Sequence, residues 1–292
     1  MKTVIRVLFL GLALVFTSAN AQEFQGEATY KTQRSVDIKL DSTSNPGMTS
    51  DLQKQMQAML KKQFQKTFTL SFNKEASIYK EEESLAPPQV GGSDMQVMVI
   101  GSGGGSDVLY KNTKNSTYTD QKDTMGKVFL VKDDIETIDW KLEKETKFIG
   151  QYQCFKATYV KMVPKPRSFS SFSVNEETED EENKKEEEPE MIERTVTAWY
   201  TLQVPVNNGP AMYQGLPGLI LEIHDGKLNI VCSKVVINPE SKIEIVEPSK
   251  GKEVNREEYD KIMDKKRKEM LERFAPRNGR RSGESIEIRI GG

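Results

Sequence analysis

Alternation between apolar and polar side chains fills most of this chain, and this period of two constrains its fold more than any other feature. In the segment TFTLSF, Phe68, Leu70 and Phe72 fall on one face and hydroxyl side chains on the other, as in a half-buried β-strand. Similar segments recur over residues 76–247, with short polar joints that favour antiparallel hairpins. The regular succession of strand and helix that builds a parallel sheet is absent. The sequence therefore predicts a mainly β protein.

Two segments carry a helical period instead. Residues 49–66 place Leu52, Met56, Met59, Leu60 and Phe64 at helical spacing behind Ser50, a suitable N-cap. Residues 251–274 place apolar side chains on one stripe and most of their charges on the other face. We expect one inserted helix and one C-terminal helix, both docked on the sheet.

The N-terminal residues 1–21 have the three parts of a secretory signal. Lys2 and Arg6 precede an apolar run, and Ala19 and Ala21 supply the small residues that signal peptidase requires. The apolar run is about half the length needed to span a bilayer, and no later segment is long enough. We expect cleavage after Ala21, no transmembrane segment afterwards, and a periplasmic or secreted product.

Charge and composition limit the partners of the chain and suggest its domain boundaries. The formal net charge of −2 for the full chain gives no excess of cations for phosphates, so nucleic acid is not expected as a partner. Residues 22–250 form one predicted β domain, interrupted by a flexible loop at 86–106 and an acidic insert at 163–191 that we expect to be disordered. The tail, residues 275–292, adds a short edge strand in this interpretation.

Few residues suggest catalysis. His224 is the only histidine, no nucleophile motif accompanies it, and Cys154, Cys232 and His224 lack the spacing of metal ligands. The segment IGSGGGSDV lacks the Gly-Lys-Ser/Thr ending of a phosphate loop. We therefore expect no catalytic residues, no metal and no cofactor. Cys154 and Cys232, the only cysteines, are either a disulfide or two buried thiols.

Aromatic residues supply the candidate binding surface. Aromatic side chains along the strands of a curved sheet can line a concave surface for a ligand, and the alternative is that they form the core. The candidates are Trp140, Tyr152, Trp199, Tyr200 and Tyr213.

The stretch GLPGLI at residues 215–220 predicts a sharp bend followed by a buried strand. Pro217 fixes φ, and Gly218 is expected to supply the positive φ of a type II turn. The structural motif consists of Gly215, Leu216, Pro217, Gly218, Leu219 and Ile220.

These six residues resemble the motif of the GLPGLI family, exported Bacteroidetes proteins without an agreed function. The segments IDWKLEKETKFIGQYQCFKATY and RTVTAWYTLQVPVNNGP also resemble that family. The family in turn resembles a bowl-like accessory domain of some secreted enzymes that release N-glycans. The resemblance implies a curved antiparallel sheet, bowl-shaped or an open barrel, and it supplies no catalytic residues.

Three functions remain open from the sequence. The leading hypothesis is a non-catalytic exported protein that binds a ligand or an envelope protein. The alternatives are a hydrolase acting on peptides or glycans, which requires two converging carboxylates, and a structural envelope or interaction module.

Overall fold

The computed structural model of the chain describes residues 24–34, 37–38, 65–82, 107–124, 126–165, 190–274 and 288–289. The predicted signal segment, the loop 86–106 and most of the acidic insert lie outside these residues. So does the predicted inserted helix, except for its last two residues, which begin a strand.

Twelve strands form one sheet in the order β13-β7-β6-β5-β4-β3-β1-β12-β11-β10-β9-β8. Every neighbouring pair is antiparallel except β13 and β7, which run parallel. This architecture confirms the mainly β, antiparallel prediction. The strands are β1 (Gln25–Arg34), β3 (Gln65–Asn73), β4 (Ala76–Glu81), β5 (Val108–Asn112), β6 (Thr117–Thr124), β7 (Lys127–Asp134), β8 (Lys141–Ile149), β9 (Tyr152–Pro164), β10 (Met191–Thr201), β11 (Leu219–Asp225), β12 (Leu228–Ile237) and β13 (Lys252–Val254).

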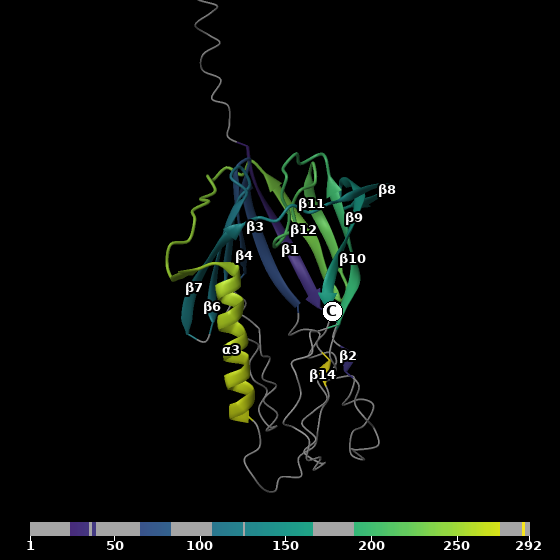
Figure 1. Cartoon of the computed structure of the whole chain (residues 1–292). Helices are drawn as coiled ribbons and strands as arrows, with labels where there is room; N and C mark the ends of the chain where they lie inside the picture. Colours follow the sequence, from purple (N-terminus) through teal and green to yellow (C-terminus); the bar gives the residue numbers. More distant parts are fainter. Residues whose placement is uncertain are drawn as a thin grey trace, which may run out of the picture.

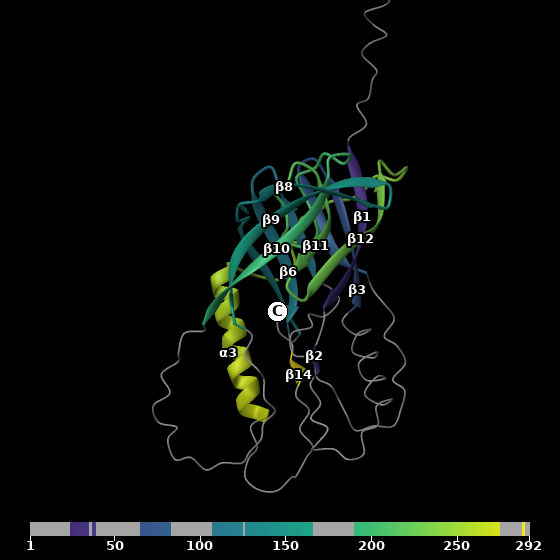
Figure 2. The same cartoon turned by 90° about the vertical axis from the view of Figure 1, so that its right-hand side faces the viewer.

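The sheet curves strongly yet stays open, because its end strands β13 and β8 do not pair with each other. In Figure 1, β6 and β7 stand on one side, β9 and β10 on the other, and β1 and β12 between them. Figure 2, turned by 90°, shows β9 and β10 crossing in front of β6. The two ends of the sheet therefore face each other across the concave side.

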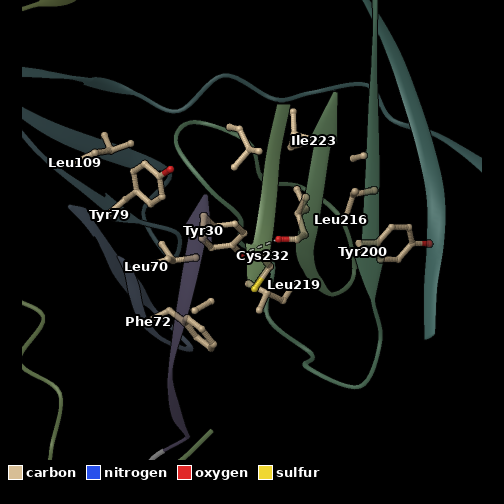
Figure 3. Close-up of a cluster of buried hydrophobic side chains, with 14 of the residues drawn as sticks. Tyr30, Leu70, Phe72, Tyr79, Leu109, Tyr200, Leu216, Leu219, Ile223 and Cys232 are labelled. Atoms are coloured by element: carbon tan, nitrogen blue, oxygen red, sulfur yellow. Dashed lines mark hydrogen bonds between the residues drawn. The ribbon is translucent and has the colours of Figure 1, made fainter. Parts of the chain in front are cut away.

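The hydrophobic core lies on this inner face. Cross-strand partners share a face of a sheet, so Ala28, Leu70 and Tyr79 form one row across β1, β3 and β4, and all three are buried. Figure 3 shows the side chains of Tyr30 and Leu70 on one side of the core and that of Ile223 on the other. One core thus joins both halves of the sheet.

Residues 202–218, which connect β10 to β11, fold into the concave side, and we call them the inner loop. The fully buried Lys111 of β5 donates hydrogen bonds to the carbonyl oxygens of Gly209 at 2.9 Å and Ala211 at 2.8 Å. Because β5 and β10 are far apart in the strand order, a loop that joins β10 to β11 reaches β5 only across the inside of the curve. Burial lowers the pKa of Lys111 to about 7.

The first residues of β11 bond to the inner loop, because β12 pairs only with the second half of β11. The N–H groups of Leu219 and Ile220 donate to the carbonyls of Val204 at 2.9 Å and Asn208 at 3.0 Å. The Ile220 carbonyl accepts a hydrogen bond from the buried Tyr30 hydroxyl at 2.7 Å, drawn as a dashed line in Figure 3. The backbone groups at the start of β11, which β12 does not reach, thus find their hydrogen-bond partners on the inner side of the sheet.

The motif glycines differ from the turn that the sequence predicts. The positive φ belongs to Gly215 (98°) and not to Gly218, so the predicted type II turn is wrong. Gly218 is required for space, since a Cβ at this position would lie 2.0 Å from the Thr201 carbonyl oxygen. The chain still bends over residues 216–218 and continues into a buried strand, as expected.

Residues 239–251 connect β12 to β13 along the sheet without pairing as a strand, so the strand expected over residues 242–247 is wrong. Instead, the Ile243 N–H donates to Gln25 Oε1 at 3.1 Å, and the Thr119 hydroxyl donates to Glu247 at 2.6 Å. Residues 239–251 therefore run from β1, past β6, to β13 at the edge of the sheet.

Helix α3 (Arg256–Phe274) begins later than the predicted residue 251, because Lys252–Val254 join β7 as β13. Asn255 then caps the helix: its Oδ1 accepts from the Glu258 N–H at 2.8 Å, and the Glu258 carboxylate accepts from the Asn255 N–H at 3.2 Å. The ring of Tyr259 packs edge-on against Phe129, 5.7 Å between centroids, which docks α3 beside β7 (Figure 1).

Two predicted boundaries also change. β9 ends at Pro164 and β10 begins at Met191, so the strands extend into the ends of the acidic insert. In the tail, β14 (Ile288–Arg289) pairs with β2 (Asp37–Ile38), separately from the main sheet. Within the described ranges, no helix has the length and apolar character needed to cross a membrane.

The buried Lys111 predicts a pH-dependent stability. Its pKa lies below the value of about 10.4 for an unfolded lysine, so between these values the unfolded chain binds more protons and stability rises with pH. Urea unfolding should show the free energy of unfolding increasing from pH 7 to 9 by up to about 1.4 kcal/mol per pH unit from this group. Lys111→Met should flatten that rise; equal slopes in both proteins would contradict the assignment.

Gly218→Ala should destabilise the protein by about 3 kcal/mol or more, because the new methyl group meets a backbone carbonyl that cannot rotate away. Gly150→Ala is the matched control: Gly150 has φ 59° but nothing within 4 Å of its Cβ position. The control should cost only about 1 kcal/mol. Thermal and urea unfolding measure both, and equal losses would refute the close-approach explanation.

Candidate functional site

The most concentrated polar group on the inner side surrounds Asp225 at the end of β11. Asp225 Oδ2 accepts hydrogen bonds from Lys161 Nζ at 2.5 Å and from the Tyr213 hydroxyl at 2.6 Å. Its Oδ1 lies 3.7 Å from Arg194 Nη1 and is buried without a hydrogen-bond partner among the described residues. We call these residues, with Tyr159 and Trp140, the Asp225 cluster.

The strand register explains why these side chains meet. Val196 of β10 pairs with Asp225 of β11 on one side and with Tyr159 of β9 on the other, so the three form one row. Arg194 pairs with Lys161 two residues further along the same strands. The two cations therefore lie beside the carboxylate on the same face of the sheet.

Aromatic rings border the cluster. Trp140 packs edge-on against Tyr159, with 4.7 Å between ring centroids, and its Nε1–H donates to the carbonyl of Gln214 in the inner loop at 2.7 Å. Trp140, Tyr159 and Tyr213 are each partly buried and pack against the core. The inner loop thus contributes Tyr213 and fixes the position of Trp140.

The electrostatics keep Asp225 ionised. Burial by itself raises the pKa of Asp225, but hydrogen bonds from Lys161 and Tyr213, together with the charges of Lys161 and Arg194, outweigh burial and bring the pKa below its usual value. Burial, followed by the contact with Asp225, raises the pKa of Tyr213, and burial raises that of Tyr159 to about 12. At neutral pH this set offers a fixed acceptor among fixed donors, an arrangement suited to binding.

A second polar group, the outer cluster, comprises Lys147, Trp199, Glu222, His224 and Asn229. Lys147 Nζ lies 2.7 Å from Glu222 and 4.4 Å from the centre of the Trp199 ring. His224 bonds through one ring nitrogen to Glu222 and through the other to Asn229. Glu222 is buried while His224 remains substantially exposed.

The five aromatic candidates of the predicted binding surface do not form one surface. Trp140 and Tyr213 meet in the Asp225 cluster, whereas Trp199 lies under Lys147 in the outer cluster. Tyr152 sits beside the β8–β9 turn, paired with Ile149. Tyr200 is 5% exposed and lies in the hydrophobic core (Figure 3).

Sequence reasoning missed Lys111, Lys161, Arg194 and Asp225. One signal was present: the alternation of β5 places Lys111 on the same face as the apolar Leu109, where a charged side chain needs a special partner. The partners of Asp225 come from separate strands and a loop, so no local sequence spacing predicts that they meet.

Cys154 and Cys232 are both buried free thiols in the structure. Their strands, β9 and β12, are separated by β10 and β11. Neighbouring strands are about 4.8 Å apart, whereas a disulfide needs Cα atoms within about 7 Å. This geometry favours the buried-thiol alternative. Burial raises the pKa of each thiol to about 11.

Among the described residues, no group of three His, Cys, Asp or Glu side chains is placed to hold a metal ion. Asp225 is surrounded by cations, and Glu222 bonds to a lysine and a histidine.

Comparison with known proteins adds a family resemblance over part of the chain. Residues 140–222 match a family described as "Protein of unknown function (Porph_ging)". The matched segment begins at Trp140 and ends at Glu222, so it contains most of both clusters and the whole inner loop. No curated protein matches the chain.

Two solved structures show a weak likeness. "Structure of PNGF-II in P21 space group" is 16% identical with a TM-score of 0.45, over 83% of this chain and 34% of that chain. "Structure of PNGF-II in C2 space group" is 15% identical with a TM-score of 0.45, over 84% of this chain and 33% of that chain. The chain thus spans about a third of the length of these proteins.

The thiols provide a direct check. In the unfolded protein, a thiol reagent such as DTNB should titrate two free thiols per chain without prior reduction. In the folded protein both should react far more slowly, because they are buried and their raised pKa leaves almost no thiolate at neutral pH. Recovery of two thiols only after reduction would show that a disulfide forms.

Proposed function

We propose that this chain is an exported, non-catalytic protein of the GLPGLI family that binds a ligand at the Asp225 cluster, in the periplasm or outside the cell. The observation that carries the proposal is the convergence of Asp225, Arg194, Lys161 and two aromatic rings on the inner face. Binding sites typically combine aromatic side chains with a few oriented polar groups.

Three further features support this proposal. The N-terminal residues have the pattern of a cleaved signal. The letters GLPGLI at residues 215–220 and the family match over residues 140–222 agree with a GLPGLI-type protein. The inner loop, which contains residues 215–218 of this motif, also supplies Tyr213 to the cluster, so the motif and the proposed site are structurally connected.

The cluster suits binding better than acid–base catalysis. A general acid or base exchanges its proton near neutral pH, whereas Asp225 is held ionised by three partners and Tyr213 is held protonated. The hydrolase hypothesis needs a second carboxylate converging on the first. The groups in hydrogen-bond or ion-pair contact with Asp225 among the described residues are two cations and a tyrosine.

Native mass spectrometry of the protein purified from its own periplasm tests this proposal. We expect the mass of the chain from Gln22 plus a reproducible bound mass. Asp225→Asn should lose the bound mass, and Lys147→Gln, a matched change in the outer cluster, should retain it. Circular dichroism would confirm that both variants fold. An empty protein, or a bound mass indifferent to Asp225→Asn, would refute binding at this cluster.

A further inference from the structure

The two end strands of the open sheet differ in length and in cover. β13 has three residues and leads after one residue into helix α3, which docks beside β7. β8 has nine residues and, as far as the described residues show, pairs only with β9. In Figure 1, β8 lies at the right-hand edge of the sheet, with no strand beyond it. The free edge of β8 therefore presents backbone N–H and C=O groups to which another strand can bond.

β8 also exposes two large apolar side chains on one face. Leu142 is 58% exposed and Phe148 is 72% exposed. They pair with Ala157 and Gln153, which are four residues apart on β9, so both side chains point to the same face of the sheet. Ala157 is fully buried in the core, which identifies this face as the inner one. Neither Leu142 nor Phe148 is part of the core, so both are available for a contact with another chain.

A second copy of β8 complements the first when the two run antiparallel with Glu145 opposite Glu145. In this register Leu142 of each copy lies opposite Phe148 of the other, so both exposed apolar side chains are covered. Glu143 of each copy lies opposite Lys147 of the other, which pairs opposite charges. A shift of the register by two residues in either direction removes both pairs. The strand is therefore complementary to itself in one particular alignment.

Two features of the middle of β8 keep this pairing weak. The two Glu145 carboxylates lie opposite each other, although each has an ion pair at 2.8 Å with Lys156 of its own chain. Residues 143–145 all stand opposite Lys156, so β8 is bulged there and its regular pairing is confined to the ends of the strand. We expect a dissociation constant of about 1 to 100 µM.

We propose that β8 is a self-association edge: two copies of this chain pair their β8 strands antiparallel, about a two-fold axis at Glu145, and thereby join their sheets. This inference goes beyond the proposed ligand binding and does not depend on it. Both copies use the same surface, so the contact closes on itself and the assembly ends at a dimer. The short β13, followed by α3, offers no comparable edge at the other end of the sheet.

Analytical ultracentrifugation at about 1 to 500 µM protein, a range that covers weak dimers, should show a concentration-dependent monomer–dimer equilibrium. Phe148→Glu and Leu142→Lys should each raise the dissociation constant about tenfold or more, because each places a charge opposite an apolar side chain twice in the dimer. Both side chains are exposed and outside the core, so both variants should fold, as circular dichroism would show. Val246→Glu is the matched control: Val246 is 69% exposed but lies away from β8, so this change should leave the equilibrium unchanged.

A mixture of the two variants tests the register itself. In a mixed dimer the introduced glutamate lies opposite the introduced lysine, and the other Leu142–Phe148 pair is intact. An equimolar mixture of Phe148→Glu and Leu142→Lys should therefore recover a dissociation constant close to that of the unchanged protein, whereas neither variant does so by itself.

Three results would overturn the proposal. A protein that remains monomeric at about 500 µM has no self-association edge of useful strength. A dimer that tolerates both Phe148→Glu and Leu142→Lys uses a different surface. A dimer that both variants weaken, but that their mixture does not restore, does not have the antiparallel register in which residue 142 meets residue 148.

Discussion

The contact that the buried side-chain nitrogen of Lys111 makes with the inner loop is the one on which the rest of the inner side depends. A loop that enters the concave face of a sheet brings peptide groups with it, and each buried carbonyl needs a donor. Lys111 satisfies two of them, on Gly209 and Ala211, from a strand on the far side of the sheet. Ala211 also adopts a left-handed backbone (φ 50°), which is costly for a residue with a Cβ. The Lys111 nitrogen thus holds a strained stretch of the loop, and burial of this nitrogen disfavours its charged form, which lowers its pKa.

The position of the inner loop connects the motif to the candidate site. Gly218 lets the loop approach Thr201, while Gly215 and Gln214 lie against Trp140. Tyr213, between these contacts and Lys111, reaches Asp225. The start of β11 is completed by the loop itself and by Tyr30 from β1. Changes in this loop therefore affect the core, the start of β11 and the Asp225 cluster together.

Particular elements show how far sequence reasoning reached. The alternation in residues 67–72 identified β3, and the charged stripe identified α3, because both periods depend on neighbours along the chain. Residues 242–247 alternate as well but do not pair as a strand, since alternation alone does not guarantee a neighbouring strand. The aromatic hypothesis placed Trp140 and Tyr213 on one surface with Tyr200, which is buried in the core, and with Trp199, which lies in the outer cluster.

Residue types and local spacing were enough to predict the class of fold and the bend at residues 216–218, and they show that His224 is the only histidine. These properties follow from residue type and local spacing. Local spacing does not predict that the inner loop lies inside the sheet, that Lys111 faces two carbonyls, or that Asp225 meets Arg194 and Lys161. Those contacts join residues from separate strands, and the curvature and register that bring them together are properties of the assembled sheet.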